Sequence, residues 1–229
     1  SIKSSNPEIL IRSYEDISFT LSVLRKYWSK LAYNIQKIRD NSSTAKDEYY
    51  SKITSHQDIK PLNSKVTFSA NKMRIKKTKL NRKPKVAILR EQGVNGHKEM
   101  AHAFMMSGFE SHDIHINDIL KGDVNLRSYE GIIACGGFSY GDVLGAGKGW
   151  ASKILYNDKA KNELELFFND KAKFALGVCN GCQMLSQLQT IIPGTKYWPV
   201  FSQNKSQQFE ARLSRVKINK SQSLFMSDM

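Results

Sequence analysis

The sequence predicts an α/β fold with a doubly wound, mostly parallel β-sheet, and three observations support this prediction. From Pro84 onward, short apolar runs typical of buried strands alternate with amphipathic stretches typical of helices. Glycine-containing turns directly follow three of these apolar runs. A cysteine flanked by glycines, Cys179, lies where the last apolar run gives way to a helical pattern.

The predicted strands and helices of this domain alternate along the chain, as crossover connections require. We expect strands over 85–89, 111–116, 131–135 and 174–178, and helices over 97–106, 144–156 and 159–168. Strands joined by such helices run parallel, and active residues then lie at their carboxyl ends. The segments after Leu89 and Cys135, and Cys179 itself, all fall at such ends, which predicts a single site.

The N-terminal third has a different pattern. Apolar side chains recur at alternating spacings of three and four residues from Tyr14 to Ile38, which predicts a long helix over 13–39 that docks onto a larger body. Residues 41–83 are polar, with a short strand candidate at 65–68. The predicted organisation is a linker helix in residues 1–40, a basic polar connector in 41–83 and the α/β domain, incomplete at its C-terminal end, in 84–229.

The formal charge of +14 is concentrated in the N-terminal third. Residues 1–83 carry 18 Lys and Arg against 7 Asp and Glu, whereas residues 84–229 carry 17 against 14. The run Lys72–Lys83 is the most basic segment, and no aromatic residues of the kind that stack on bases are interleaved with it. We therefore interpret it as a solvated connector, with a nucleic-acid-binding module as the alternative.

The three cysteines predict a reducing, cytoplasmic environment, because an odd set offers no disulfide framework. Cys179 and Cys182 form a Cys-x-x-Cys, for which a redox motif or half of a zinc site is the competing interpretation. No second cysteine pair follows and no histidine lies after His115, so we expect no metal site. No apolar run approaches the length that spans a bilayer, so we expect no membrane partner.

Cys179 has the local sequence of a nucleophile elbow. The apolar run 174–176 precedes it, glycines at 177 and 181 flank it, and the helix-like run 184–188 follows. Small neighbours let the backbone adopt a strained turn that exposes the sulfur, and the helix N-terminus favours the thiolate. Its N–H groups, and those of the Gly136-Gly137 turn, can hold an oxyanion formed beside the cysteine.

Three segments together carry a specific resemblance: 89–95, 134–147 and 176–184, extended by Trp198-Pro199 and by 209–212. Residues 84–229 closely resemble the glutamine amidotransferase domain at the C-terminus of the large, single-chain formylglycinamide ribonucleotide amidotransferases, also called phosphoribosylformylglycinamidine synthases. The predicted helix at 13–39 resembles the segment that joins this family's synthetase core to the amidotransferase. The fold that the resemblance implies is flavodoxin-like.

The resemblance implies class I glutamine amidotransferase chemistry, with Cys179 as the nucleophile that attacks the side-chain amide of glutamine. It implies a glutamyl thioester, ammonia release and hydrolysis, with the oxyanion held by backbone N–H groups near Gly137 and Asn180. The residues that it places around the glutamine are Gln183, Asn204, Ser206 and Phe209. The ammonia would serve the ATP-dependent amidine-forming step of de novo purine biosynthesis. ATP and Mg²⁺ would be bound by upstream synthetase domains of the same polypeptide, and this chain itself would hold no cofactor.

The family places a catalytic His and Glu downstream of the cysteine, and neither has a counterpart in this sequence. The five histidines, at positions 56, 97, 102, 112 and 115, all precede Cys179. A cysteine nucleophile needs a base. We therefore expect a fragment of the enzyme that is inactive or nearly so by itself. The alternatives are another flavodoxin-like cysteine-elbow hydrolase or chaperone, and a free-standing small amidotransferase subunit.

Overall fold

The computed structural model describes residues 8–54, 82–217 and 219–226 of the chain. These residues divide into two compact units. The helical unit contains residues 8–54, 203–217 and 219–221, and the sheet unit contains residues 82–202 and 222–226.

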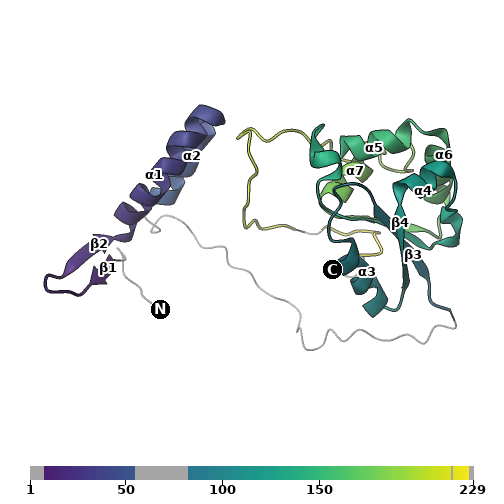
Figure 1. Cartoon of the computed structure of the whole chain (residues 1–229), viewed down its shortest axis with the longest axis horizontal. Coiled ribbons are helices and arrows are strands. Elements are labelled where there is room, and N and C mark those ends of the chain that lie inside the picture. Colours follow the sequence, from purple (N-terminus) through teal and green to yellow (C-terminus); the bar gives the residue numbers. More distant parts are fainter. Residues whose placement is uncertain (1–7, 55–81, 218, 227–229) are drawn as a thin grey trace. The chain divides into compact units, whose positions relative to one another are not determined.

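The sheet unit is built on four parallel strands, partly labelled in Figure 1. They are β3 (Lys85–Arg90), β4 (Glu110–His115), β5 (Gly131–Ala134) and β6 (Phe174–Gly177), and their order across the sheet is β4-β3-β5-β6. The first of the four strands along the chain therefore lies in the interior of the sheet. This order is that of a flavodoxin-like sheet, which confirms the predicted fold class.

Helices cover both faces of this sheet, because the side chains of each strand alternate between two apolar cores. On β3, Ala87 and Leu89 belong to the larger core, whereas Val86 and Ile88 belong to a smaller core that contains Phe104 of α3. Figure 1 shows α3 apart from the other helices of the unit. The helices are α3 (His97–Met106), α4 (Ile116–Lys121), α5 (Lys148–Leu155), α6 (Asp158–Asn169) and α7 (Asn180–Gln187), with short 3₁₀ turns η3 (Leu126–Ser128) and η4 (Ser139–Asp142).

Two boundaries in the sheet unit differ from the prediction. The helix expected from residue 144 begins at Lys148, because Gly145 and Gly147 have positive φ angles that an α-helix does not contain. The strand expected to reach residue 116 ends at His115, and Ile116 starts the short helix α4. Six residues are too few to show a helical period, so α4 was not visible in the sequence.

The helical unit begins with an antiparallel hairpin of β1 (Glu8–Ile11) and β2 (Ile17–Thr20). Helix α1 (Leu21–Arg39) follows directly, so the helix expected over 13–39 lacks its first turns. Residues 17–20 form a strand because they pair with β1, from Ile9 opposite Phe19 to Ile11 opposite Ile17. The 3–4 spacing of apolar residues could not reveal this pairing, which depends on a second segment of chain.

Part of the expected connector is also helical. Helix α2 (Ser42–Ile53) occupies the start of the 41–83 region, and Asn41 caps it by accepting hydrogen bonds from the N–H groups of Ser43 at 3.1 Å and Thr44 at 3.2 Å. An Asn before Ser-Ser-Thr is a helix-start signal that the polar composition of this region obscured. The strand candidate at 65–68, and the basic run up to residue 81, lie outside the described residues.

Helices α1 and α2 lie side by side (Figure 1), and aromatic side chains form their contact. Tyr33 and Tyr49 stack with ring centroids 4.5 Å apart. Helix α1 nevertheless has no buried residue among its nineteen, and its Trp28, Leu31 and Ile38 are largely exposed. Among the described residues, no helix is long and apolar enough to cross a membrane.

Candidate active site

Cys179 occupies the turn between β6 and α7, as the nucleophile-elbow pattern predicted. Its backbone has φ 52° and ψ −116°, a conformation that a residue with a Cβ rarely adopts. Two hydrogen bonds hold the turn, from the N–H of Val178 to the carbonyl of Ala134 at 2.9 Å and from the N–H of Gln183 to the carbonyl of Cys179 at 3.0 Å. The thiol is exposed at the carboxyl end of the sheet, which is the position from which a nucleophile can reach a substrate.

The flanking glycine at 181 has a steric function in this turn. A Cβ on Gly181 would lie 2.1 Å from the carbonyl oxygen of Ala134, in the neighbouring strand β5. No side chain fits in that space, so the start of α7 approaches the sheet only because residue 181 is glycine. This close approach places the first N–H groups of the helix next to Cys179.

The turn after β5 lies against the cysteine. A Cβ on Gly136 would lie 3.1 Å from Cβ and 3.9 Å from Sγ of Cys179. The next residue, Gly137, has φ 125° and is paired with Val94 in an isolated β-bridge. Hydrogen bonds from the N–H of Asn95 to the carbonyl of Gly136 at 2.7 Å, and from the N–H of Phe138 to Gly93 at 2.8 Å, hold the turn on both sides.

Asn180, predicted to offer its backbone N–H to the oxyanion, begins α7, so this N–H has no acceptor within the helix. Its side chain is fully buried and joins the elbow to the glycine-rich loop that follows β5, residues 136–147. The side-chain oxygen accepts from the N–H of Ser139 at 3.2 Å and from its hydroxyl at 2.7 Å. The side-chain nitrogen donates to Asp142 and to Gln183, each at 3.2 Å. The sequence predicts Asn180 at the oxyanion but does not reveal this second role.

The glycine-rich loop that Asn180 holds is strained. Tyr140, Asp142 and Ala146 have φ angles of 54°, 52° and 53°, and all three carry a Cβ. The Asp142 carboxylate also accepts a hydrogen bond from the N–H of Gly147 at 3.0 Å. Unfavourable backbone conformations persist only where surrounding contacts enforce them, and they concentrate at functional sites. The loop and the elbow therefore form one braced structure around Cys179.

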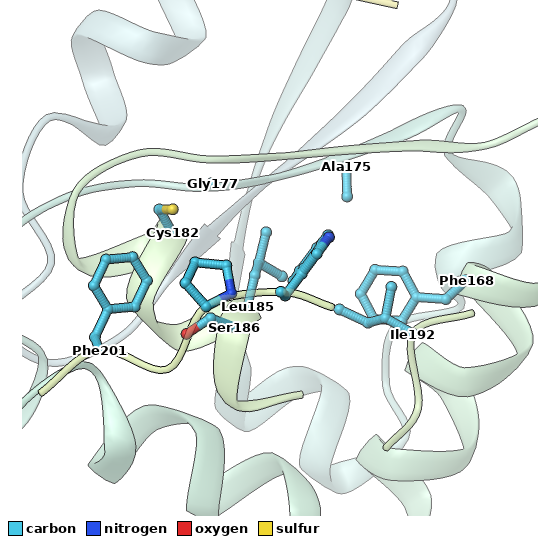
Figure 2. Close-up of a pocket in the computed structure, with 10 residues that line it drawn as sticks. Phe168, Ala175, Gly177, Cys182, Leu185, Ser186, Ile192 and Phe201 are labelled. Carbon is cyan, nitrogen blue, oxygen red and sulfur yellow. The ribbon is translucent and has the colours of Figure 1, made fainter. Parts of the chain in front are cut away.

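The neighbouring cysteine, Cys182, faces away from this structure. It lines an apolar cavity of about 190 Å³ beside α7, with Leu185 and Phe201 nearby (Figure 2). Cys179 is not among the residues that line this cavity, so it is not the space in which a substrate would meet the nucleophile. The lining residues are Phe168, Ala175, Gly177, Cys182, Leu185, Ser186, Ile192, Trp198, Pro199 and Phe201.

Cys135 is chemically inert by comparison. Its side chain is buried in the smaller core, and burial, together with the negative charges of Asp113 and Glu99, raises its pKa to about 11. Its thiolate is therefore scarce near neutral pH. Of the three cysteines, only Cys179 combines exposure, a strained turn and adjacent backbone donors.

The residues predicted to hold glutamine fall into both units. Gln183 lies on α7, where its side-chain oxygen accepts from Asn180. Asn204, Ser206 and Phe209 belong to the helical unit, so the structure does not test their relation to Cys179. Ser206 is buried and donates to Glu210 at 2.6 Å, Asn204 donates to the carbonyl of Gln208 at 3.0 Å, and Phe209 is exposed. The roles of all four residues remain predictions.

None of the four histidines that the structure describes is hydrogen-bonded to Cys179. His112 contacts Tyr129 at 3.0 Å and Glu110 at 2.6 Å, and the ring of His115 accepts from the N–H of Asn117 at 3.1 Å. His97 and His102 lie on α3. Within the described ranges, no hydrogen bond joins the Cys179 thiol to a histidine, and no three His, Cys, Asp or Glu side chains are grouped so as to hold a metal ion.

A family of known proteins matches more than half of this chain. Residues 83–229 match the family of CobB/CobQ-like glutamine amidotransferase domains, which covers more than half of the chain. Among solved structures, that of PurLQS from Thermotoga maritima is 31% identical over 47% of this chain and 45% of its own, with a TM-score of 0.36. The matched region therefore spans less than half of that protein.

Proposed function

Because the chain belongs to the CobB/CobQ-like glutamine amidotransferase family, we propose that Cys179 releases ammonia from glutamine for the amidation of formylglycinamide ribonucleotide in purine biosynthesis. The observation that supports this most strongly is the strained, exposed Cys179 beside the Gly136-Gly137 turn. The acceptor is supported by the sequence of three segments, 89–95, 134–147 and 176–184, which resemble those of the purine-pathway enzymes.

The proposed reaction begins when the Cys179 sulfur attacks the side-chain carbonyl carbon of glutamine. The carbonyl oxygen becomes an oxyanion, which the N–H groups of Gly137 and Asn180 stabilise by donating hydrogen bonds. The C–N bond then breaks, and the nitrogen leaves as ammonia after it takes a proton. Water attacks the remaining glutamyl thioester, which yields glutamate and restores the thiol.

We further propose that the ammonia is used by synthetase domains that also bind ATP and Mg²⁺, and that glutamine contacts Gln183, Asn204, Ser206 and Phe209. The acceptor is tested in the protein isolated from its natural source, with glutamine labelled at the amide nitrogen, ATP, Mg²⁺ and formylglycinamide ribonucleotide. The label should appear in the amidine product. Label that remains entirely in free ammonia would contradict the proposed acceptor.

The 229-residue chain by itself should turn glutamine over slowly. The proton that the amide nitrogen needs has no donor in hydrogen-bond contact with Cys179 among the described histidines. General acid–base assistance typically contributes about 10²- to 10⁴-fold to such a step. A reagent whose leaving group needs no proton, such as the γ-p-nitrophenyl ester of glutamate, should bypass this requirement and acylate the thiol directly.

The decisive experiment measures this acylation. With the ester in excess, the wild-type chain should release one burst of p-nitrophenolate and carry a glutamyl group on Cys179 by peptide mass spectrometry. Cys179→Ala should lose the burst. Cys182→Ser serves as the matched control and should react like wild type, because Cys182 lines a separate cavity. A glutamyl group on Cys182, or none on any cysteine, would refute the proposed nucleophile.

A further inference from the structure

A buried carboxylate, Glu91, lies directly after β3 and takes no part in the reaction described above. Its side chain is only 2% exposed. Removing a charged carboxylate from water is strongly unfavourable unless other groups pair with it and donate hydrogen bonds to it. A protein that keeps such a group near its active site gains something specific from it, so its partners are informative.

The partners of Glu91 come from several parts of the sheet unit. One carboxylate oxygen accepts from the N–H of Gln92 at 2.9 Å and the other from the Lys153 ammonium on α5 at 3.0 Å. The same ammonium donates to Asn117 on α4 at 2.7 Å, and the His115 ring lies 3.8 Å from the carboxylate. The cluster thus connects the end of β3 with α4 and α5.

These partners keep Glu91 ionised. Burial opposes ionisation, but the N–H of Gln92, the nearby Tyr140 hydroxyl and the Lys153 ammonium together outweigh it, so the pKa of Glu91 lies below its usual value. The Tyr140 hydroxyl makes no hydrogen bond of ordinary geometry among the described residues, yet it is close enough to influence this carboxylate. Glu91 is therefore a fixed negative charge over the working pH range of most enzymes.

The turn that Glu91 anchors, residues 92–94, also holds the glycine-rich loop that follows β5. The carbonyl of Gln92 accepts from the N–H of Tyr140 at 3.0 Å, and the carbonyl of Gly93 accepts from Phe138 at 2.8 Å. Lys153 reaches the same loop, because its ammonium lies 5.5 Å from the centre of the Tyr140 ring. Gly137 lies between these contacts, paired with Val94.

We propose that the Glu91–Lys153 pair positions the N–H of Gly137 for the oxyanion, so that Glu91 is a positioning residue for acyl transfer at Cys179. This inference rests on the proposed function. Glu91 holds the turn at residues 92–94 through the Gln92 N–H, the turn holds the loop at Phe138 and Tyr140, and Lys153 contacts both ends of this chain of interactions. In this role neither side chain needs to touch the substrate.

The test compares two reactions of the same thiol. Acylation by the γ-p-nitrophenyl ester of glutamate passes through an oxyanion, whereas alkylation by iodoacetamide displaces iodide and forms none. Glu91→Gln keeps the size of the side chain but removes its charge. We expect acylation of Cys179 to slow by about 10- to 100-fold, because small displacements of catalytic groups have effects of this order. Alkylation by iodoacetamide should stay within about twofold of wild type.

Several variants separate positioning from general damage. Lys153→Met should reproduce the selective loss of acylation, and Lys153→Arg should restore most of it. The matched control is Asp113→Asn, which removes an exposed ion pair with Arg90 (3.0 Å) between β3 and β4, and it should change neither rate. If Glu91→Gln does not fold, as shown by circular dichroism, the Lys153 variants carry the test alone.

The outcomes distinguish this inference from the function on which it rests. Equal slowing of acylation and alkylation, or no slowing of acylation, would overturn the positioning role while Cys179 remains the nucleophile. If the wild-type chain is alkylated at Cys179 but never acylated by the ester, the proposed function fails and the positioning role fails with it.

Discussion

The sheet unit and the helical unit both contain regularly spaced apolar side chains, but they bury very different shares of them. In the sheet unit, Trp150, Leu164 and Phe167 are almost completely inaccessible and belong to one continuous core. In the helical unit, α1 presents Trp28, Leu31 and Ile38 to solvent. The buried residues of α2 are Ala45 and Tyr49. The same kind of pattern therefore gives a core in one region and an exposed stripe in the other.

The difference shows what amphipathic periodicity does and does not determine. A 3–4 spacing places apolar side chains on one face of a helix, but burial needs a second surface of matching shape. In the sheet unit the strands supply that surface. In the helical unit α2 covers only the side of α1 that carries Tyr33. Strained backbone is concentrated in the sheet unit, where packing can enforce it. Cys179, Tyr140, Asp142 and Ala146 have positive φ angles there, against Gln207 in the described part of the helical unit.

The largest expected effect comes from removing one tryptophan in each unit. Trp150→Ala should destabilise the sheet unit by about 3–5 kcal/mol, because a fully buried side chain leaves a cavity. Trp28→Ala should change stability by less than about 0.5 kcal/mol, since Trp28 is 89% exposed. Hydrogen exchange in native conditions measures both, in β3 and β5 peptides for Trp150→Ala and in α1 peptides for Trp28→Ala. A loss above about 2 kcal/mol for Trp28→Ala would contradict the comparison.

A smaller effect is expected from two matched helix caps. Asn157 caps α6 in the sheet unit by accepting from the N–H of Ala160 at 3.0 Å, and Asn41 caps α2 in the helical unit. Replacing either with Ala should cost about 1 kcal/mol. Asn157→Ala should speed hydrogen exchange across the cooperative core of the sheet unit, whereas Asn41→Ala should speed it only in α2. Faster exchange in β3 for Asn41→Ala would show that the two units unfold together.

The last effect is confined to alkaline pH. Burial raises the pKa of Cys135 to about 11, so the folded state holds this proton more tightly than the unfolded chain does. The contribution to stability is complete below the ordinary thiol pKa of about 8.5 and is lost as pH rises toward 11. The urea midpoint should therefore fall more steeply over this window for wild type than for Cys135→Ala. Parallel curves would show that Cys135 ionises equally well in both states.

The sequence predicted the parts of the fold that repeat locally. The bounds of α3 match the expected helix over 97–106, and the four strands lie within about one residue of their predicted ends. Strands β3, β5 and β6 are short apolar runs, as is typical of parallel strands, whereas β4 at the sheet edge is mostly polar. It missed β1 and the hairpin, because pairing between Ile9 and Phe19 joins separate segments. It also missed α2, whose face is mostly polar and whose start depends on the Asn41 cap.

The candidate site shows the same division at the level of single residues. Cys179 and its glycine neighbours were identified because a nucleophile elbow needs small residues at fixed, adjacent positions. Asp142 and the side-chain role of Asn180 were not, because the two residues are 38 positions apart and meet only when the elbow packs against the loop. Of the polar residues around the site, only Glu91 could have been recognised as buried from the sequence, because it directly follows an apolar strand.

The sequence by itself determined the sheet type, the strand-to-helix turn and the position of Cys179 in that turn, because each depends on residues that are neighbours in the chain. Only the tertiary structure decided that Cys182 faces a separate apolar cavity, that Asn180 ties the elbow to the glycine-rich loop, and that Glu91 is neutralised by Lys153 from 62 positions away. These contacts depend on strand order and helix placement. The physical reason is that a buried charge or amide is stable only beside specific partners, and folding alone brings those partners together.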